Sequence, residues 1–270
     1  MVNLFGAGFV GGEYQRQYEC VVNTRDDYQA QTNDILYFIS TIHNYHVFTD
    51  THIDIDTNLT CLIRTLDLAR DKFDSDFTFN FVSSWFVYGN TDMPANESSI
   101  CYPRGFYSIT KRTAEQLLIS YCETFGIRYR ILRLANVLGR NDSKVSAQKN
   151  ALQYLINCMR DNEPIELYDD GDFYRDYIDV EDAVRAINLV ITKGEINSIY
   201  NISNGHSLKF RDIIDYVHQR LNSRSEIQSI PQREFHKLVQ VKTMYLDNSR
   251  LQALGYRPRY TINQTLDRLL

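Results

Sequence analysis

The chain has 270 residues and a net charge of −5, with 43% apolar residues and a mean hydropathy of −0.38. This length suits one large α/β domain, or a core domain with a smaller second region. The acidic balance does not indicate a nucleic-acid surface, and no apolar run is long enough to span a membrane. The five cysteines form no CxxC pair and the N-terminus shows no secretory signal, so we expect a cytoplasmic protein with reduced thiols.

The chain opens with a predicted strand, Val2–Phe5, that runs directly into a glycine-rich turn over 6–11 and a predicted helix over 12–18. In a strand–GxGxxG–helix unit the glycines permit a tight turn and a close approach to a pyrophosphate at the helix N-terminus. A glycine turn without a ligand is the alternative. The residues expected to bind a dinucleotide here are Gly6, Gly8, Phe9, Val10 and Gly11.

The second predicted strand covers 20–24 and ends in the sequence Asn23-Thr24-Arg25-Asp26. An acidic residue at this place binds the ribose hydroxyls of NAD, whereas an arginine accommodates the 2′-phosphate of NADP. We therefore expect Asn23, Thr24 and Arg25 to contact the cofactor and to favour NADP. NAD remains possible, with Asp26 or Asp27 on the ribose and Arg25 merely solvated.

Too few residues separate Asp27 from the next predicted strand, 35–40, for a full strand–helix–strand crossover. A helix and a strand that are usual in such folds are therefore expected to be shortened or missing. Ser40 and Thr41, at the end of this strand, are included among the expected cofactor contacts.

Three histidines, His43, His46 and His52, follow in a loop. No carboxylate or cysteine completes a metal-binding set with them, so we interpret them as loop or substrate-contact residues and expect no metal.

An amphipathic helix over 50–72 precedes a buried strand, 79–84, and a long helix that contains neither Gly nor Pro over 106–125. Tyr107 and Lys111 are four residues apart and share one face of this helix. A lysine ammonium beside a phenol favours the phenolate, so we expect a lowered Tyr107 pKa and proton exchange with a carbinol or carbonyl. Ser84, at the strand end, could hydrogen-bond the same oxygen. A chance Tyr-xxx-Lys on a solvated helix is the alternative.

The remaining elements alternate between short strands and helices, with Asp179 as the expected N-cap of a helix that ends at 191. We expect a cofactor-binding domain over 1–162 that also receives 178–203, and a mainly substrate-binding region over 163–270. The other predicted strands are 129–134, 165–168 and 199–202, and the other helices are 147–160, 210–221, 248–254 and a helix after 261.

The order and spacing of five motifs resemble the extended short-chain dehydrogenase/reductase family, and more narrowly its nucleotide-sugar epimerases, dehydratases and reductases. The resemblance extends over nearly the whole chain. It implies a Rossmann-type doubly wound parallel sheet with a smaller mixed α/β C-terminal region, a nucleotide-diphosphate sugar as substrate, and a homodimer. The motifs are Gly6-x-Gly8-x-x-Gly11, Asp56-Thr57-Asn58, Ser83-Ser84-x-x-Val87-Tyr88-Gly89, Tyr107-x-x-x-Lys111 and Arg175-Asp176-Tyr177-Ile178.

The resemblance implies a role for each matching position. Ser84 takes the place of the catalytic serine, Tyr107 that of the acid/base, and Lys111 that of the residue that binds the nicotinamide ribose. The implied substrate-binding residues are Ser84, Trp85, Asn136, Arg175 and Lys237. Arg175 would hold the diphosphate. Lys237 stands where many members of the family have a second phosphate-binding arginine. A lysine lacks the fork for a bidentate contact.

Two departures from the family pattern narrow the chemistry. Trp85 and Phe86 occupy the positions of the Asp-Glu pair of the family's dehydratases, and neither can move a proton. Trp85 also replaces the cysteine used in 3,5-epimerisation of the GDP-fucose-synthase type. Hydride chemistry at a sugar carbon remains, as a 4-epimerase if the transfer is transient or a 4-keto reductase if it is net. A non-catalytic sensor or scaffold on the same fold is the competing hypothesis.

Overall fold

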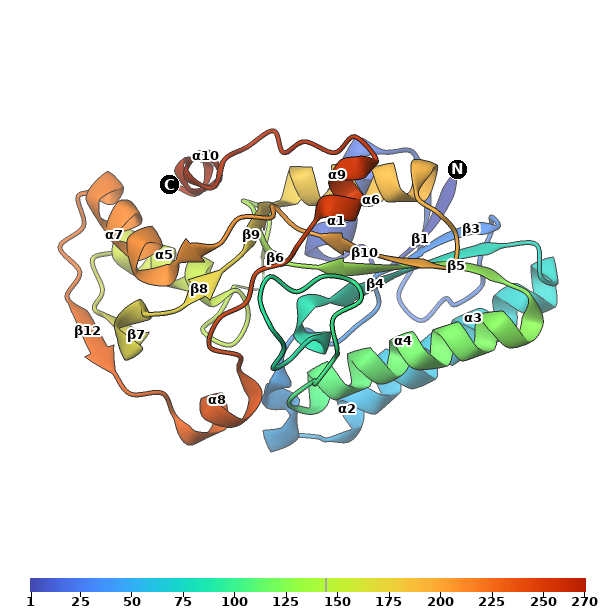
Figure 1. Ribbon diagram of the computed structural model, residues 1–270, viewed down its shortest axis with the longest axis horizontal. Helices are drawn as coiled ribbons and strands as arrows, with labels where there is room; N and C mark the ends of the chain where they lie inside the picture. The colour runs from blue at the N-terminus through green and yellow to red at the C-terminus, as the bar shows by residue number, and fades with distance from the viewer. Residues whose placement is uncertain (144) are drawn as a thin grey trace.

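The structure is a computed structural model that describes residues 1–143 and 145–270. Its centre is a sheet of six strands, all of them parallel (Figure 1). Most inner strands read as continuous buried runs, as expected for a parallel sheet covered on both faces. In spatial order the strands are β10 (Ser198–Ile202), β5 (Arg128–Leu134), β4 (Thr78–Ser84), β3 (Asp34–Tyr37), β1 (Val2–Phe5) and β2 (Cys20–Asn23).

Helices cover both faces of this sheet, which confirms the predicted doubly wound architecture. On one face α1 (Phe9–Gln17) packs against α6 (Val180–Lys193), and on the other lie α3 (Cys61–Phe73) and α4 (Phe106–Phe125) (Figure 1). The side chains of successive residues in a strand point to opposite faces of the sheet. Thus Ile35 belongs to the hydrophobic core beneath α3 and α4, and Leu36 to the core beneath α1 and α6.

One half of the sheet is shorter than in a full doubly wound fold. Strand β2 lies at the edge, and the connection over 24–33 passes without a helix to β3 on the other side of β1. A parallel crossover usually takes a dozen or more residues and a helix. The predicted loss of a helix and a strand is therefore confirmed for the described residues.

Two buried asparagines hold this short connection in place. Asn3 on β1 donates to the side chain of Asn23 on β2, and its own oxygen accepts from the backbone N–H groups of Gln31 and Thr32. Asn23 in turn donates to the carbonyl of Gln29 at 2.9 Å. Side-chain hydrogen bonds thus replace the helix that normally orders such a crossover.

The helix predicted over 50–72 is divided in the structure. It begins as α2 (His52–Ile55), widens into a π-helical turn η2 (Asp56–Thr60), and continues as α3. Such turns are often found at functional sites. Here the turn carries the buried Asn58.

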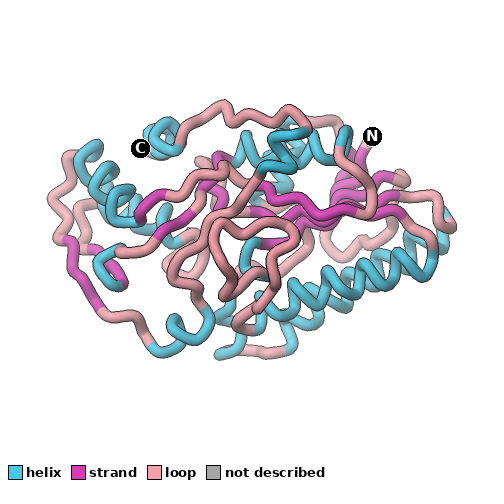
Figure 2. Tube along the Cα trace, viewed as in Figure 1, coloured by secondary structure: helices cyan, strands magenta, loops and turns pink. Residues whose placement is uncertain are grey.

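The C-terminal region is a smaller α/β layer around its own hydrophobic core (Figure 2). Asp179 accepts a hydrogen bond from the backbone N–H of Glu181 at 2.9 Å, which confirms its prediction as the N-cap of α6. The short strands pair as β7 with β12, β8 with β11, and β6 with β9. The elements are β6 (Asn136–Leu138), α5 (Ala151–Arg160), β7 (Ile165–Tyr168), β8 (Tyr174–Arg175), β9 (Tyr177–Asp179), β11 (Leu208–Lys209), α7 (Phe210–Leu221), β12 (Ile227–Ile230), α8 (Glu234–Val239), α9 (Ser249–Ala253) and α10 (Ile262–Leu269).

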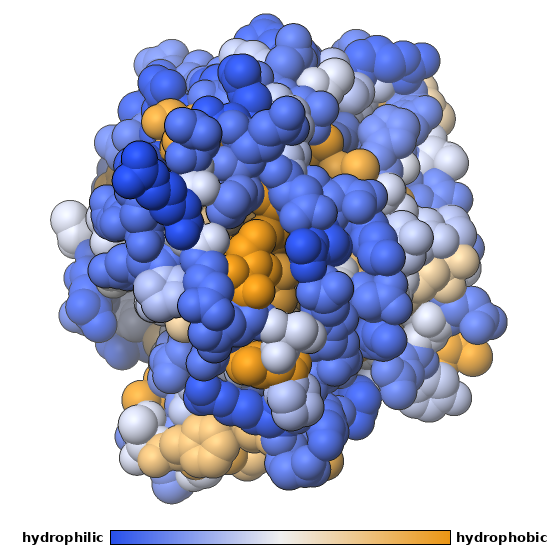
Figure 3. All heavy atoms as spheres, turned by 90° about the vertical axis from the view of Figure 1, so that its left-hand side faces the viewer, coloured by the Kyte–Doolittle hydropathy of each residue, from blue (hydrophilic) through white to orange (hydrophobic). Residues whose placement is uncertain are grey.

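Residues after 178 return to the central sheet, because α6 packs on α1 and β10 pairs with β5. The division at 162 stays a prediction. Among the described residues no helix is long and apolar enough to cross a bilayer. The surface at the end of the molecule that carries α7 and β12 is mostly hydrophilic, with hydrophobic residues visible in its recesses (Figure 3).

The short helix η1 (Asn44–Phe48) joins the two parts of the molecule through contacts with α8. The Tyr45 hydroxyl lies 3.0 Å from Nε2 of His236, and the Tyr45 and Phe48 rings pack on Phe235 with centroids 5.2 and 4.6 Å away. We call this set the η1–α8 contact.

Candidate active site

A cleft of about 1990 Å³ lies at the C-terminal ends of the parallel strands, where open α/β sheets bind their ligands. Its walls come from the glycine turn, the loop after β3, the end of β4, α4 and the C-terminal region. Most of the predicted site residues meet there. They are Gly6, Gly8, Phe9, Val10, Gly11, Arg25, Ser40, Thr41, Ser84, Trp85, Tyr107, Lys111, Asn136 and Arg175.

The glycine turn has the shape that a pyrophosphate requires. Gly6 has φ +89°, a conformation that other residues rarely adopt, and a Cβ on Gly11 would lie 2.3 Å from the Gly6 carbonyl oxygen. A Cβ on Gly8, in contrast, would meet nothing within 4 Å. The first turn of α1 has no acidic residue and no side-chain cap, and its residues Phe9, Val10 and Gly11 line the cleft. The turn therefore fits the diphosphate of a dinucleotide.

The end of β2 is arranged differently from the prediction. Asn23 is buried, its side chain is used to hold the 24–33 connection, and neither Asn23 nor Thr24 lines the cleft. Arg25 does line it and is exposed. Of the three predicted residues, only Arg25 lines the cleft.

Asn58 ties the loop after β3 to α4 and was not predicted as a site residue. Its oxygen accepts from the Ser40 hydroxyl and the Thr41 N–H at 3.0 and 2.9 Å. Its nitrogen donates to the hydroxyls of Thr41 and Thr110, both at 2.9 Å. The Thr110 hydroxyl in turn donates to the carbonyl of Tyr107. The Asp56-Thr57-Asn58 motif was the available signal for this residue.

Tyr107 lies in the first turn of α4, with its phenol against the hydroxyls of Ser84 and Ser40. Burial raises the Tyr107 pKa, and hydrogen bonds from the two serines offset part of this rise. The prediction that Lys111 lowers this pKa is therefore wrong for this structure. Ser84 also accepts from the Phe86 N–H at 3.3 Å, which fixes the end of β4 beside the phenol.

The Lys111 ammonium points to the backbone of β4 instead of the phenol. It donates to the Val82 carbonyl at 2.8 Å and lies 4.1 Å from the centroid of the Phe81 ring. Burial lowers the Lys111 pKa to about 7, while the carboxylate of Glu115, one turn further along α4, acts in the opposite direction. Lys111 is thus buried at the edge of the cleft.

Trp85 and Asn136 form another part of the cleft wall. The Trp85 indole N–H donates to the Asn136 oxygen at 3.1 Å, and the Asn136 nitrogen donates to the Asp176 carbonyl, also at 3.1 Å. Trp85 stacks on Phe86 at 3.9 Å, and Phe86 meets the Tyr107 ring edge-on. An aromatic wall therefore borders the phenol where a dehydratase would have its proton-transfer residues.

Arg175 places a positive charge in the cleft. Among the described residues, no carboxylate forms an ion pair with it. Its guanidinium donates to the carbonyls of Tyr174, Val241 and Lys242 and lies 4.6 Å from the Phe173 ring centroid. Burial lowers its pKa to about 10, so it stays charged at neutral pH. A preorganised and uncompensated guanidinium is suited to a phosphate group.

Lys237 does not lie where a substrate-binding residue was predicted. It lies on α8, its ammonium pairs with Glu234 at 2.6 Å, and it does not line the cleft. Arg233 and Lys242, which the sequence analysis did not single out, line the cleft nearby.

The three histidines are also separated. His43 and His46 line the cleft with ring centroids 4.2 Å apart, whereas His52 is exposed beside Asp50. His46 lies 3.4 Å from the buried Asp54. No group of three or more metal-binding side chains occurs in the part of the chain that the structure describes.

Comparison with known proteins places this architecture among sugar-nucleotide enzymes. A putative UDP-glucose 4-epimerase of Methanocaldococcus jannaschii is 29% identical over 80% of this chain and 69% of its own length. A GDP-6-deoxy-D-mannose reductase of Pseudomonas aeruginosa is 27% identical over 77% of this chain and 70% of its own length. A trifunctional UDP-glucose 4,6-dehydratase/UDP-4-keto-6-deoxy-D-glucose 3,5-epimerase/UDP-4-keto-L-rhamnose-reductase of Arabidopsis thaliana is 30% identical over 67% of this chain, which spans only 27% of that protein.

Solved structures share the fold over almost the full chain. The UDP-glucose 4-epimerase of Thermotoga maritima, solved with UDP-glucose, superposes with a TM-score of 0.87 at 20% identity and covers 99% of this chain and 96% of its own. The model of the NAD dependent epimerase/dehydratase family matches residues 20–203. With this match over more than half of its length, the chain belongs to the NAD dependent epimerase/dehydratase family, and it is an enzyme of the extended short-chain dehydrogenase/reductase group.

Proposed function

We propose that the protein is an NAD(P)-dependent enzyme that transfers hydride at C4 of a nucleotide-linked sugar, as a 4-epimerase or a 4-keto reductase. The observation that carries this proposal is the meeting of Ser84, Tyr107 and Lys111 at one end of a cleft that has a glycine turn on one side and Arg175 on another. Family membership and sugar-nucleotide relatives of both reaction types support it.

The cofactor would be held by the chain's own residues along the cleft. The glycine turn and the first-turn N–H groups of α1 would bind the diphosphate, Arg25 a 2′-phosphate, and Lys111 the ribose beside the nicotinamide. A bound nicotinamide dinucleotide supplies the hydride acceptor and donor. Asn58 keeps the Ser40 loop against α4, so the floor between these contacts is fixed before binding.

The sugar would be oriented by residues around the Tyr107 phenol. Ser84 donates to the sugar oxygen, and Tyr107 gives or takes its proton as the carbinol and keto forms interchange. Arg175 holds the substrate's phosphates at the far side of the aromatic wall. Trp85 and Phe86 offer no proton beside C5 or C6, so elimination of water has no acid or base at that place.

A ligand-identification experiment tests the proposal most directly. Purified protein is incubated with a panel of UDP-, GDP-, CDP- and dTDP-sugars, including 4-keto sugars, with NADPH or NADH. Mass spectrometry of the products and cofactor absorbance are then recorded. A changed sugar with constant cofactor indicates an epimerase, and a changed sugar with oxidised cofactor a reductase. Failure to convert or bind any nucleotide sugar would contradict the proposal.

The first prediction concerns Tyr107. Tyr107→Phe removes only the phenol oxygen and should lower turnover by about 10²–10⁴, the usual contribution of a positioned acid/base, with folding and cofactor affinity unchanged. Lys111→Met removes the residue that we propose binds the nicotinamide ribose, and it should weaken NADPH binding and lower activity. Tyr102→Phe, in an exposed loop outside the cleft, is the control. Native turnover in Tyr107→Phe would refute the assignment.

The second prediction concerns cofactor choice. We propose a preference for NADP(H), because Arg25 is exposed at the cofactor end of the cleft and forms no ion pair with another described residue. Arg25→Ala should weaken NADPH binding much more than NADH binding in calorimetric titrations. Equal weakening of both, or tighter NADH binding by the native protein, would contradict it.

The third prediction concerns Arg175. Arg175→Ala removes a charge-assisted contact worth about 1.5–3 kcal/mol, so affinity for the nucleotide sugar should fall at least tenfold while cofactor affinity is kept. The variant also loses three hydrogen bonds to carbonyls, so its melting temperature is measured alongside. A lower melting temperature with native substrate affinity would assign Arg175 to structure alone.

The fourth prediction concerns assembly. We propose a homodimer formed through α4, because Ile109 and Leu117 are exposed apolar residues two turns apart on this helix. Ile109→Glu/Leu117→Glu should convert a dimer into a monomer in sedimentation velocity. A native protein that sediments as a monomer at all concentrations would exclude the dimer.

A further inference from the structure

Two side chains from the segment after β3, His46 and Asp54, form a histidine–carboxylate pair at the wall of the cleft. His46 belongs to η1 and lines the cleft, and Asp54 belongs to α2 and is fully buried. Nδ1 of His46 lies 3.4 Å from Oδ1 of Asp54. A carboxylate at one ring nitrogen fixes the proton there, so the other nitrogen, Nε2, is left as the acceptor. Among the described residues Nε2 of His46 makes no hydrogen bond, so it is available to a ligand.

Asp54 has less hydrogen bonding than a buried carboxylate with a purely structural role would need. Its Oδ1 also accepts a hydrogen bond from the Thr41 hydroxyl, but its Oδ2 is buried and has no partner in the described part of the chain. Such an unsatisfied buried oxygen costs free energy and calls for an explanation. A carboxylate in this position stabilises the imidazolium that forms when His46 takes up a proton.

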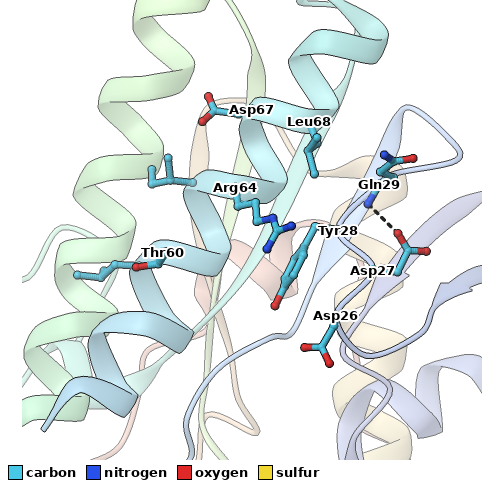
Figure 4. Close-up of a pocket in the computed structure, with 10 residues that line it drawn as sticks. Asp26, Asp27, Tyr28, Gln29, Thr60, Arg64, Asp67 and Leu68 are labelled. Carbon is cyan, nitrogen blue, oxygen red and sulfur yellow. Dashed lines mark hydrogen bonds between the residues drawn. The ribbon is translucent and has the colours of Figure 1, made fainter.

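The helical segment that carries Asp54 is held in place from both sides. It continues through η2 into α3, where Arg64 lines a smaller cavity of about 730 Å³. Figure 4 shows Arg64 and Tyr28 reaching toward each other across this cavity, and the guanidinium lies 4.9 Å from the centroid of the Tyr28 ring. On the other side Asn58 of η2 binds the loop after β3 through its hydrogen bonds. The carboxylate is therefore positioned before any substrate binds.

The His46–Asp54 pair lies close to the Tyr107 phenol. Helix η1 packs against α4, and the Tyr107 N–H donates to the side chain of Asn44 in η1 at 3.2 Å. The Tyr107 pKa is raised mainly by burial, and the negative charge of Asp54 adds to the rise. The phenol therefore stays protonated and can donate a hydrogen bond to a ligand that the pair also reaches.

The pair and the aromatic wall flank this phenol on different sides. The Tyr107 hydroxyl contacts Ser40, after β3, and Ser84, at the end of β4. The residue after Ser40 donates to Asp54, whereas the aromatic wall begins with Trp85, directly after Ser84. In the proposed orientation C5 and C6 of the sugar lie beside the wall. C3, on the other side of C4, therefore faces the pair.

We propose that His46, positioned by Asp54, is a second acid/base of this site and exchanges the proton on C3 of a bound 4-keto sugar. This is an activity besides hydride transfer at C4, and it is the first half of an epimerisation at C3. The inference rests on the proposed function, because only a ketone at C4 makes the proton on C3 acidic.

The step needs no oxidant or reductant. Nε2 of His46 takes the proton from C3, and the electron pair of the broken C–H bond forms a double bond between C3 and C4. The negative charge moves to the C4 oxygen, where the hydroxyls of Ser84 and Tyr107 donate to the enolate. Return of a proton from His46 to C3 restores the ketone. In D₂O the returning proton is a deuteron.

The test is solvent deuterium exchange. UDP-4-keto-6-deoxy-D-glucose and its GDP- and dTDP-linked counterparts are incubated in D₂O with the native protein and NADP⁺, which cannot reduce the ketone. NMR and mass spectrometry then locate and count the deuterium, with a protein-free blank for spontaneous exchange. Parallel samples with NADPH measure hydride transfer to C4. The native protein should introduce deuterium at C3 faster than the blank.

Three variants test the assignment of the base. His46→Gln should lower C3 exchange by about 10²-fold relative to hydride transfer at C4 in the same preparation, since it removes a positioned acid/base. Asp54→Asn should lower the same ratio, which a loss of folded protein alone would not change because it reduces both rates alike. Imidazole added to His46→Ala should restore part of the exchange. His52→Gln is the matched control, because His52 is exposed in the same segment and does not line the cleft.

The possible failures are distinguishable. If the native protein neither binds nor reduces any of these keto sugars, the proposed function fails and this inference fails with it. Hydride transfer at C4 without deuterium at C3 above the blank overturns the second activity alone. Deuterium at C5 in place of C3 would overturn the placement of the pair. His43 also lines the cleft, but its Nδ1 accepts from the Tyr45 N–H at 3.2 Å. Exchange that persists in His46→Gln and is lost in His43→Gln would overturn the assignment to His46.

Discussion

The geometry of the cleft depends on one buried ion pair, between Glu115 on α4 and Arg133 on β5. Both side chains are almost fully buried, and the guanidinium makes two hydrogen bonds to the carboxylate, of 3.0 and 2.8 Å. Burying two charges is expensive, and it is tolerated only when the geometry is nearly ideal. Because Glu115 lies two turns from Tyr107 on one helix face, this pair fixes the rotation of α4. That rotation directs Tyr107 toward Ser84 and Lys111 toward β4.

The sequence predicted the structure correctly where a local pattern of residues is compatible with only one local conformation. The glycine turn allows little besides a tight strand-to-helix connection, and the structure reproduces it with Gly6 at positive φ and Gly11 against a carbonyl. The long helix without Gly or Pro was predicted with its observed ends, 106 and 125, which set Tyr107 and Lys111 one turn apart. The short distance between β2 and β3 likewise predicted the reduced half of the sheet.

The prediction failed where residues far apart in the sequence share the same polar atoms. Asn23 looked available to a cofactor, but its side chain is occupied by Asn3 and the 24–33 connection. Lys237 was chosen by its spacing, and the unpredicted α8 turns it toward Glu234 instead. The Tyr107 pKa depends on how deeply the phenol is buried, which periodicity does not report. Such properties are set by tertiary packing, so a single sequence contains no local signal for them.

The η1–α8 contact also determines how a ligand can leave. Its residues line the cleft, and they join an element of the sheet half to an element of the C-terminal region. Two aromatic contacts and one hydrogen bond contribute about 1 kcal/mol each, so separating the elements costs about 3 kcal/mol. A gap on this side would then be open for about one part in a hundred of the time. Exchange of a bound molecule through this side is therefore expected to be gated. Its rate would be set by the separation of η1 from α8 and not by diffusion.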